Sequence, residues 1–70
     1  MAVLSGTVVS FDDHRGWGEV EDEEGRRHRF HCTRIAGGLR TIAAGTPVLF
    51  ELAPGLPGRW EAVDVRPSQT

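Results

Sequence analysis

Apolar and polar residues alternate over short stretches of this 70-residue chain, and clusters of glycine, proline and charged residues separate the stretches. A period of two is typical of strands with one buried face, and β-branched and aromatic residues favour strands. The pattern predicts five strands, at residues 3–11, 16–21, 26–31, 48–52 and 60–65. Gly6, inside the first of them, marks the point where a barrel strand is expected to bend.

The second and third strands are joined by a three-residue loop, residues 23–25. Hairpin loops of this length need a residue in the left-handed region, which Gly25 adopts without strain. The loop sets a register in which the opposed pairs are Trp17 with His31, Gly18 with Phe30, Glu19 with Arg29, Val20 with His28 and Glu21 with Arg27. Alternation then places Val20 and Phe30 on the buried face. The residues on the solvent face are Trp17, Glu19, Glu21, Arg27, Arg29 and His31.

The segments between the other strands predict turns and one long crossover. Polar or Pro/Gly-rich turns are predicted at residues 12–15 and 54–58. Residues 32–44 show no alternation, and Gly37 and Gly38 interrupt any long helix. A short helical turn at residues 33–35, followed by a crossover loop that ends at Gly45, is therefore expected.

Five short strands without a long helix predict an all-β domain, a five-stranded antiparallel Greek-key barrel of the OB-fold type. An SH3-like barrel has the same number of strands and competes with it. Seventy residues allow one domain with one small core. We expect residues 1–66 to form this domain and residues 67–70 to be a C-terminal tail.

The composition limits the kinds of site that this chain can form. The lone Cys32 excludes an internal disulfide framework, and no Cys/His spacing resembles a four-ligand zinc site, so neither a metal nor another cofactor is expected. No apolar run approaches the roughly 20 residues of a membrane span, and the expected location is the cytoplasm. A net charge of −2 argues against strong general affinity for polyanions, so any such binding needs a local patch.

Two motifs resemble the paired nucleic-acid-binding motifs of the cold-shock domain family. Arg15-Gly16-Trp17-Gly18-Glu19-Val20 stands where the family usually has Lys-Gly-Phe-Gly-Phe-Ile, and His28-Arg29-Phe30-His31 where it has Val-Phe-Val-His. Residues 6–11, 41–51 and 62–65 match further family segments in the same order. The resemblance implies a cold-shock barrel whose exposed face stacks single-stranded bases on aromatic rings.

Several aromatic positions of that face carry other residues here. The replaced positions are Ser10, Glu19, Arg29, Cys32 and Leu39. The resemblance implies nucleic-acid binding by Arg15, Trp17, Arg29 and His31, since a guanidinium plane can also stack on a base. Secondary candidates are Ser10, Leu39, Arg40 and Trp60; we expect Trp60 to close the barrel end rather than to stack.

The replacements change the expected electrostatics and affinity. Two cross-strand ion pairs are expected on the face, Glu19 with Arg29 and Glu21 with Arg27. Each stacked base is worth roughly 1–3 kcal/mol, so the loss of three platforms would cost about 3–9 kcal/mol. The sequence therefore predicts a weak or altered binder.

His28, His31 and Cys32 lie close in sequence, but strand alternation separates His31 from the other two. His28 is expected to be a half-buried histidine near the barrel end, and Cys32 a small packed hydrophobe. No third group orients a nucleophile and base, so we expect no enzyme.

Two functional hypotheses remain open. In the first, the protein binds single-stranded RNA or DNA as an RNA chaperone or in a transcription-related role. In the second, the barrel is a protein-interaction module whose charged face surrounds Trp17 and meets a protein partner. The chain is expected to be a monomer or a strand-exchanged dimer.

Overall fold

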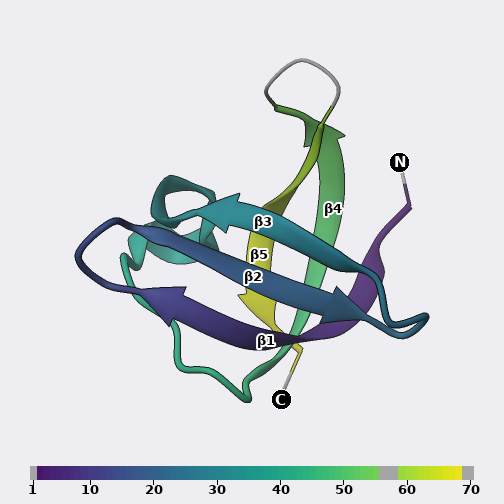
Figure 1. Cartoon of the computed structure of the whole chain (residues 1–70), viewed down its shortest axis with the longest axis horizontal. Coiled ribbons are helices and arrows are strands. Elements are labelled where there is room, and N and C mark those ends of the chain that lie inside the picture. The colour runs from purple at the N-terminus through teal and green to yellow at the C-terminus, as the bar shows by residue number, and fades with distance from the viewer. Residues whose placement is uncertain (1, 56–58, 69–70) are drawn as a thin grey trace.

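The computed structural model describes residues 2–55 and 59–68, and these form a closed five-stranded barrel (Figure 1). The strands are β1 (Leu4–Asp12), β2 (Trp17–Asp22), β3 (Arg27–His31), β4 (Pro47–Pro54) and β5 (Trp60–Pro67). Their order around the barrel is β1-β2-β3-β5-β4, with β4 pairing back to β1. The predicted all-β barrel is confirmed. Its β3–β5 contact is parallel and short, while the other strand pairs are antiparallel.

The core takes side chains from every strand. Its buried members are Val8, Val20, Phe30, Ile35, Val48, Phe50, Ala62 and Val65. Phe11 stacks on Phe30 with ring centroids 5.8 Å apart. Complete burial of a phenylalanine stabilises the fold by about 1.5–3 kcal/mol, so Phe30 and Phe50 are large contributors in a chain of this size.

A β-bulge in β1 decides which residues of that strand face solvent. Val8 pairs with Val20, but the next pair is Ser10 with Glu19, so Val9 is an extra residue. The bulge reverses the alternation, because Val8 and Phe11 face the core while Ser10 is exposed. Earlier in β1, Gly6 pairs with both β2 and β4, and a Cβ there would overlap the backbone oxygen of Glu21.

The predicted hairpin and turn are confirmed. The β2–β3 register is the predicted one from Trp17–His31 to Glu21–Arg27. Gly25 has a φ of 83° and donates its N–H to the carbonyl of Asp22 at 3.0 Å. In the β1–β2 turn, one oxygen of the Asp12 carboxylate accepts hydrogen bonds from the backbone N–H groups of His14 and Arg15, at 2.9 and 3.1 Å.

The crossover contains two short 3₁₀ segments rather than one turn. They are η1 (Cys32–Arg34), which begins one residue before the predicted turn, and η2 (Ala36–Gly38), which was not predicted. Between them, Ile35 enters the core and bridges to Val65. Thr41 donates a hydrogen bond of 2.7 Å to the Asp13 carboxylate, which ties the crossover to the β1–β2 turn.

The last hairpin is longer than predicted. β4 and β5 pair from Val48–Pro67 to Pro54–Trp60, and Gly55 donates its N–H to the carbonyl of Arg59 at 3.0 Å. Residues 56–58 of the predicted connector and residues 69–70 of the predicted tail lie outside the described residues. In the part of the chain that is described, no helix is long and apolar enough to cross a membrane.

Candidate nucleic-acid interface

The exposed face of the β2–β3 hairpin carries most of the residues selected from the sequence. Glu19 lies opposite Ser10 of β1 on one side and Arg29 of β3 on the other, and Arg29 lies opposite Glu61 of β5. Polar residues therefore form a row across four strands. Because side chains on one face of a sheet alternate with those on the other, this row lies outside the barrel.

Trp17, Arg29 and His31 form one cluster on this face. The guanidinium carbon of Arg29 lies 4.4 Å from the centroid of the Trp17 ring, within the range of a cation–π contact. The ring of His31 meets Trp17 edge-on, with centroids 4.8 Å apart. Three of the four principal candidates are thus brought into contact.

The ring of His31 is held in one orientation. Its Nδ1 atom accepts a hydrogen bond of 3.3 Å from the backbone N–H of Thr33 and lies 2.9 Å from the hydroxyl of the same residue. An Nδ1 that accepts leaves the proton of the neutral ring on Nε2. The start of η1 therefore fixes the tautomer and position of the ring beside Trp17.

The two predicted ion pairs are wrong. Instead of the directly opposed pairs, the structure has one diagonal contact, 3.8 Å between Arg27 Nη1 and Glu19 Oε1. The guanidinium of Arg29 lies over Trp17 instead. Diagonal neighbours are within reach of long side chains. Both partners of the observed pair are largely exposed, so it contributes little stability.

The prediction that Trp60 closes the barrel end is also wrong. Its side chain is 62% exposed. β5 begins at Trp60, in the part of the β4–β5 hairpin that extends past the three front strands (Figure 1). The ring therefore lies outside the buried core, which β5 enters first at Ala62.

Trp60 borders a cavity of about 290 Å³ that sequence reasoning did not identify. The cavity lies between β5 and the β2–β3 hairpin, and its lining includes Glu19, Arg27, Arg29, Arg59 and Glu61. The strand order of the barrel could have predicted that these residues meet, because it places β3 beside β5 and pairs Arg29 with Glu61.

The cluster does not include Arg15, Leu39 or Arg40. Arg15 is exposed in the β1–β2 turn, 3.9 Å from the Asp12 carboxylate. Leu39 is exposed, and with Arg40 and Cys32 it lines a separate cavity of about 200 Å³. Cys32 is partly buried against the core, as predicted.

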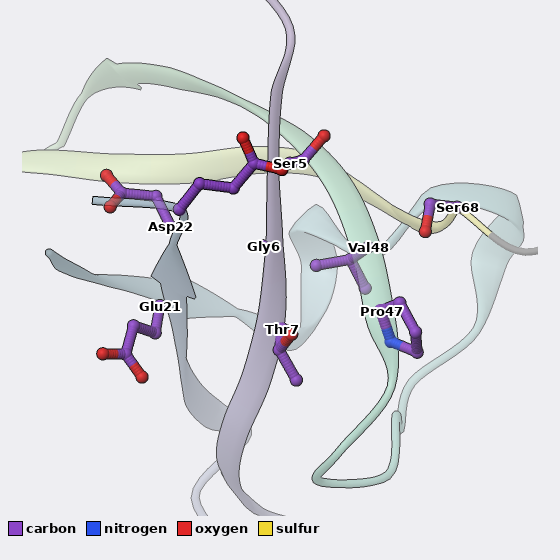
Figure 2. A pocket seen from close by; sticks show the side chains of 9 residues that line it. Ser5, Gly6, Thr7, Glu21, Asp22, Pro47, Val48 and Ser68 are labelled. Atoms are coloured by element: carbon purple, nitrogen blue, oxygen red, sulfur yellow. The ribbon is translucent and has the colours of Figure 1, made fainter. Parts of the chain in front are cut away.

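A larger cavity, about 420 Å³, lies elsewhere and has the wrong charge for phosphate. Figure 2 shows Glu21 and Asp22 on one side of β1, with Pro47 and Val48 on the other. Glu23 adds a third carboxylate, and no arginine is among the described residues that line the cavity. Carboxylates repel a phosphate chain, so the arginine-bearing cavity at Trp60 is the better candidate.

Asp22 anchors the hairpin that carries the face. One oxygen of its carboxylate accepts hydrogen bonds from the backbone N–H groups of Glu24 and Arg26, both at 2.9 Å, and the other lies 2.9 Å from Nε2 of His28. The hydrogen bond from His28, followed by that from the Arg26 backbone, lowers the pKa of Asp22 below its ordinary value of 3.8. His28 is half-buried near Phe50, as predicted.

Comparison with known proteins assigns the family. The chain is 37% identical to Cold shock-like protein CspC of Shigella flexneri over 60 residues, which are 83% of this chain and 87% of that protein. The chain belongs to the cold-shock domain family. It is also 40% identical to Glycine-rich protein 2 of Nicotiana sylvestris over 62 residues, 86% of this chain but 29% of that protein. No family model matches the chain.

Membership of the cold-shock family allows the residues of the exposed face to be compared with the family motifs. Trp17 and His31 keep rings where the family motifs quoted above have rings, whereas Glu19 and Arg29 replace a facing pair of phenylalanines. The guanidinium carbon of Arg29 lies over the Trp17 ring instead, 4.4 Å from its centroid. This cold-shock barrel thus has a mixed face of ring, guanidinium and carboxylate.

Proposed function

We propose that this protein binds single-stranded RNA or DNA on the exposed face of the β2–β3 hairpin. The observation that carries the proposal is the cluster of Trp17, Arg29 and His31, with the guanidinium 4.4 Å from the indole centroid. An indole and a guanidinium both stack on bases without reading their identity. Membership of the cold-shock family supports the proposal, and the role that follows is that of an RNA chaperone or a transcription-related protein.

In the proposed mechanism, Arg29 acts as a layer of the stack. An incoming base either lies on the guanidinium plane above Trp17 or displaces Arg29, which is then available to a phosphate. Arg15, in the β1–β2 turn that leads into β2, supplies a second positive charge beside the Asp12 carboxylate. A strand held in this way cannot pair with its complement, so binding is stoichiometric and favours the unpaired state.

The affinity is expected to be lower than that of a fully aromatic platform. Each base stacked on an aromatic ring is worth roughly 1–3 kcal/mol, and Glu19 replaces one such ring with a negative charge. The side chain of Glu19 is 41% exposed and its carboxylate lies 3.8 Å from Arg27, so its charge is only partly compensated. A phosphate chain passing over it is repelled.

A second candidate function rests on Trp60. An indole that is 62% exposed and flanked in sequence by Arg59 and Glu61 has the composition of an anchor in a protein interface, an aromatic ring within a polar rim. In that case the same face binds a protein partner, and oligonucleotides do not compete for it.

Fluorescence titration tests the leading proposal. The chain has two tryptophans, so W60F leaves Trp17 as the single reporter. A short pyrimidine-rich DNA strand is expected to quench Trp17, and added salt is expected to reverse the quenching. With a fluorescein-labelled strand followed by anisotropy, the W17A/R29A double variant is expected to lose binding, and R34A, which changes an exposed arginine of η1, is expected to keep it. A flat signal at high micromolar strand contradicts nucleic-acid binding and favours the second candidate.

A further inference from the structure

The cavity at Trp60 brings together a ring, an acceptor and donors from different strands. Glu19 comes from β2, Arg27 and Arg29 from β3, and Trp60 and Glu61 from β5. Its volume of about 290 Å³ is close to the roughly 300 Å³ at which ligand pockets begin. The Trp17 cluster stacks bases without preference, so the polar lining of this neighbouring cavity is where base identity can be read.

Trp60 is the exposed ring of the cavity. It is 62% exposed and is not among the described residues that form the buried core. Amphipathic aromatic surfaces of this kind stack on nucleic-acid bases. A base that leaves the Trp17 cluster along the strand can therefore continue onto Trp60.

Glu19 is the carboxylate with free acceptor capacity. Its contact with Arg27 is 3.8 Å long, beyond hydrogen-bond distance, so its lone pairs stay available. Glu61 also lines the cavity, and its side chain packs against Gly55. The cavity is thus lined by a carboxylate, which only accepts hydrogen bonds, beside a guanidinium, which only donates them.

This combination matches one base. Guanine presents two adjacent donors, N1–H and the N2 amino group, and acceptors at O6 and N7, and arginine is the usual partner of O6 and N7. Thymine and uracil present one donor flanked by carbonyl oxygens, which a carboxylate repels. We propose that the cavity is a guanine-reading subsite, in which the base stacks on Trp60, Glu19 accepts from N1 and N2, and Arg27 donates to O6 or N7.

This inference rests on the proposed function, and the two are tested by different comparisons. An oligothymidine of about eight nucleotides is compared with the same strand carrying a single guanine, each labelled and titrated with the unchanged protein. The guanine strand is expected to bind about tenfold more tightly. Inosine in place of guanine lacks the N2 amino donor and is expected to lose most of this gain.

Variants assign the preference to residues. E19Q replaces a carboxylate, which only accepts hydrogen bonds, with an amide, which also donates them. It is expected to remove the preference for guanine. E21Q makes the same charge change two residues away, outside the cavity, and is expected to keep it. W60A is expected to weaken binding of the guanine strand more than that of oligothymidine.

The outcomes separate the two proposals. Equal affinity of the unchanged protein for both strands overturns the guanine subsite and leaves single-strand binding intact. A preference that survives in E19Q also overturns it. Failure of the protein to bind either strand overturns the proposed function itself.

Discussion

Glu19 occupies the centre of the face, opposite Arg29 on β3 and Ser10 on β1, at a position where the family motif has phenylalanine. E19F is expected to strengthen oligothymidine binding by roughly 5- to 150-fold, because one stacked base contributes about 1–3 kcal/mol. Loss of the exposed contact with Arg27 costs little. The same variant is expected to lose any preference for guanine, and anisotropy titration of both strands measures the two effects together.

E21F is the matched control for E19F. Glu21 is on the same strand and the same face, but it pairs with Arg27 near the hairpin end, away from Trp17. Its replacement is expected to change oligothymidine affinity much less. If E19F leaves oligonucleotides unbound, the face does not stack bases, and the protein-interaction function is favoured instead.

At the level of residues, backbone register was predictable and side-chain partners were not. Gly25 in a three-residue loop is enough to set Glu19 opposite Arg29. Register does not determine where a guanidinium on a flexible stem goes. Arg29 lies over Trp17 because a ring face is within its reach, and a contact with a ring competes well with an exposed ion pair.

The β2–β3 hairpin depends on Asp22, and this dependence is expected to appear as acid sensitivity. The folded state lowers the pKa of Asp22 below 3.8, so the ionised carboxylate stabilises the fold at pH values above about 3.8. That stability is lost as the pH falls through the lowered pKa of the folded state. D22N is expected to be less stable than the unchanged protein near neutral pH, and the difference is expected to shrink on acidification through this range.

Urea unfolding at a series of pH values, followed by far-ultraviolet circular dichroism, measures this difference. E23Q removes one negative charge from the same hairpin at an exposed position and serves as the control. It is expected to follow the unchanged protein at every pH. A D22N variant whose deficit stays constant down to strongly acid pH would show that the hairpin needs the shape of Asp22 rather than its charge.

At the level of elements, alternation located all five strands but not their irregularities. The bulge at Val9 cannot be read from alternation, yet it turns Ser10 outward to face Glu19, where the family resemblance had placed it. β4 extends to Pro54 and β5 to Pro67, beyond their predicted ends, because the two strands pair with each other from Pro54–Trp60 to Val48–Pro67. Alternation alone therefore predicts strands that end too early, and it does not predict on which side of the sheet Trp60 lies.

At the level of the whole molecule, barrel closure creates the cavity. Glu19 and Trp60 are far apart in sequence and meet because β3 pairs with β5 through Arg29 and Glu61. That pairing is parallel and covers a single residue pair, so it leaves almost no trace in the sequence. The fold class was predictable from strand number and motif order, whereas the polar half of the candidate site depends on closure.

The net charge of −2 gives the last prediction, which concerns salt. A protein with this charge binds a strand only through the few arginines at its face, and Arg15, Arg29 and Arg59 are placed for phosphate contacts. Three such contacts predict a slope of log K against log salt concentration of about −2, or about a 15-fold loss between roughly 50 and 200 mM salt.

Single variants divide this slope among residues. R59Q is expected to make it shallower by about 0.7, the contribution of one phosphate contact to a single strand. R34Q removes the same charge from η1, outside the Trp60 cavity, and is expected to leave the slope unchanged. A slope of about −5 or steeper would require more phosphate contacts than these arginines supply. Binding would then spread over the barrel instead of residing on one face, because only additional cations elsewhere on the molecule can release the extra counterions.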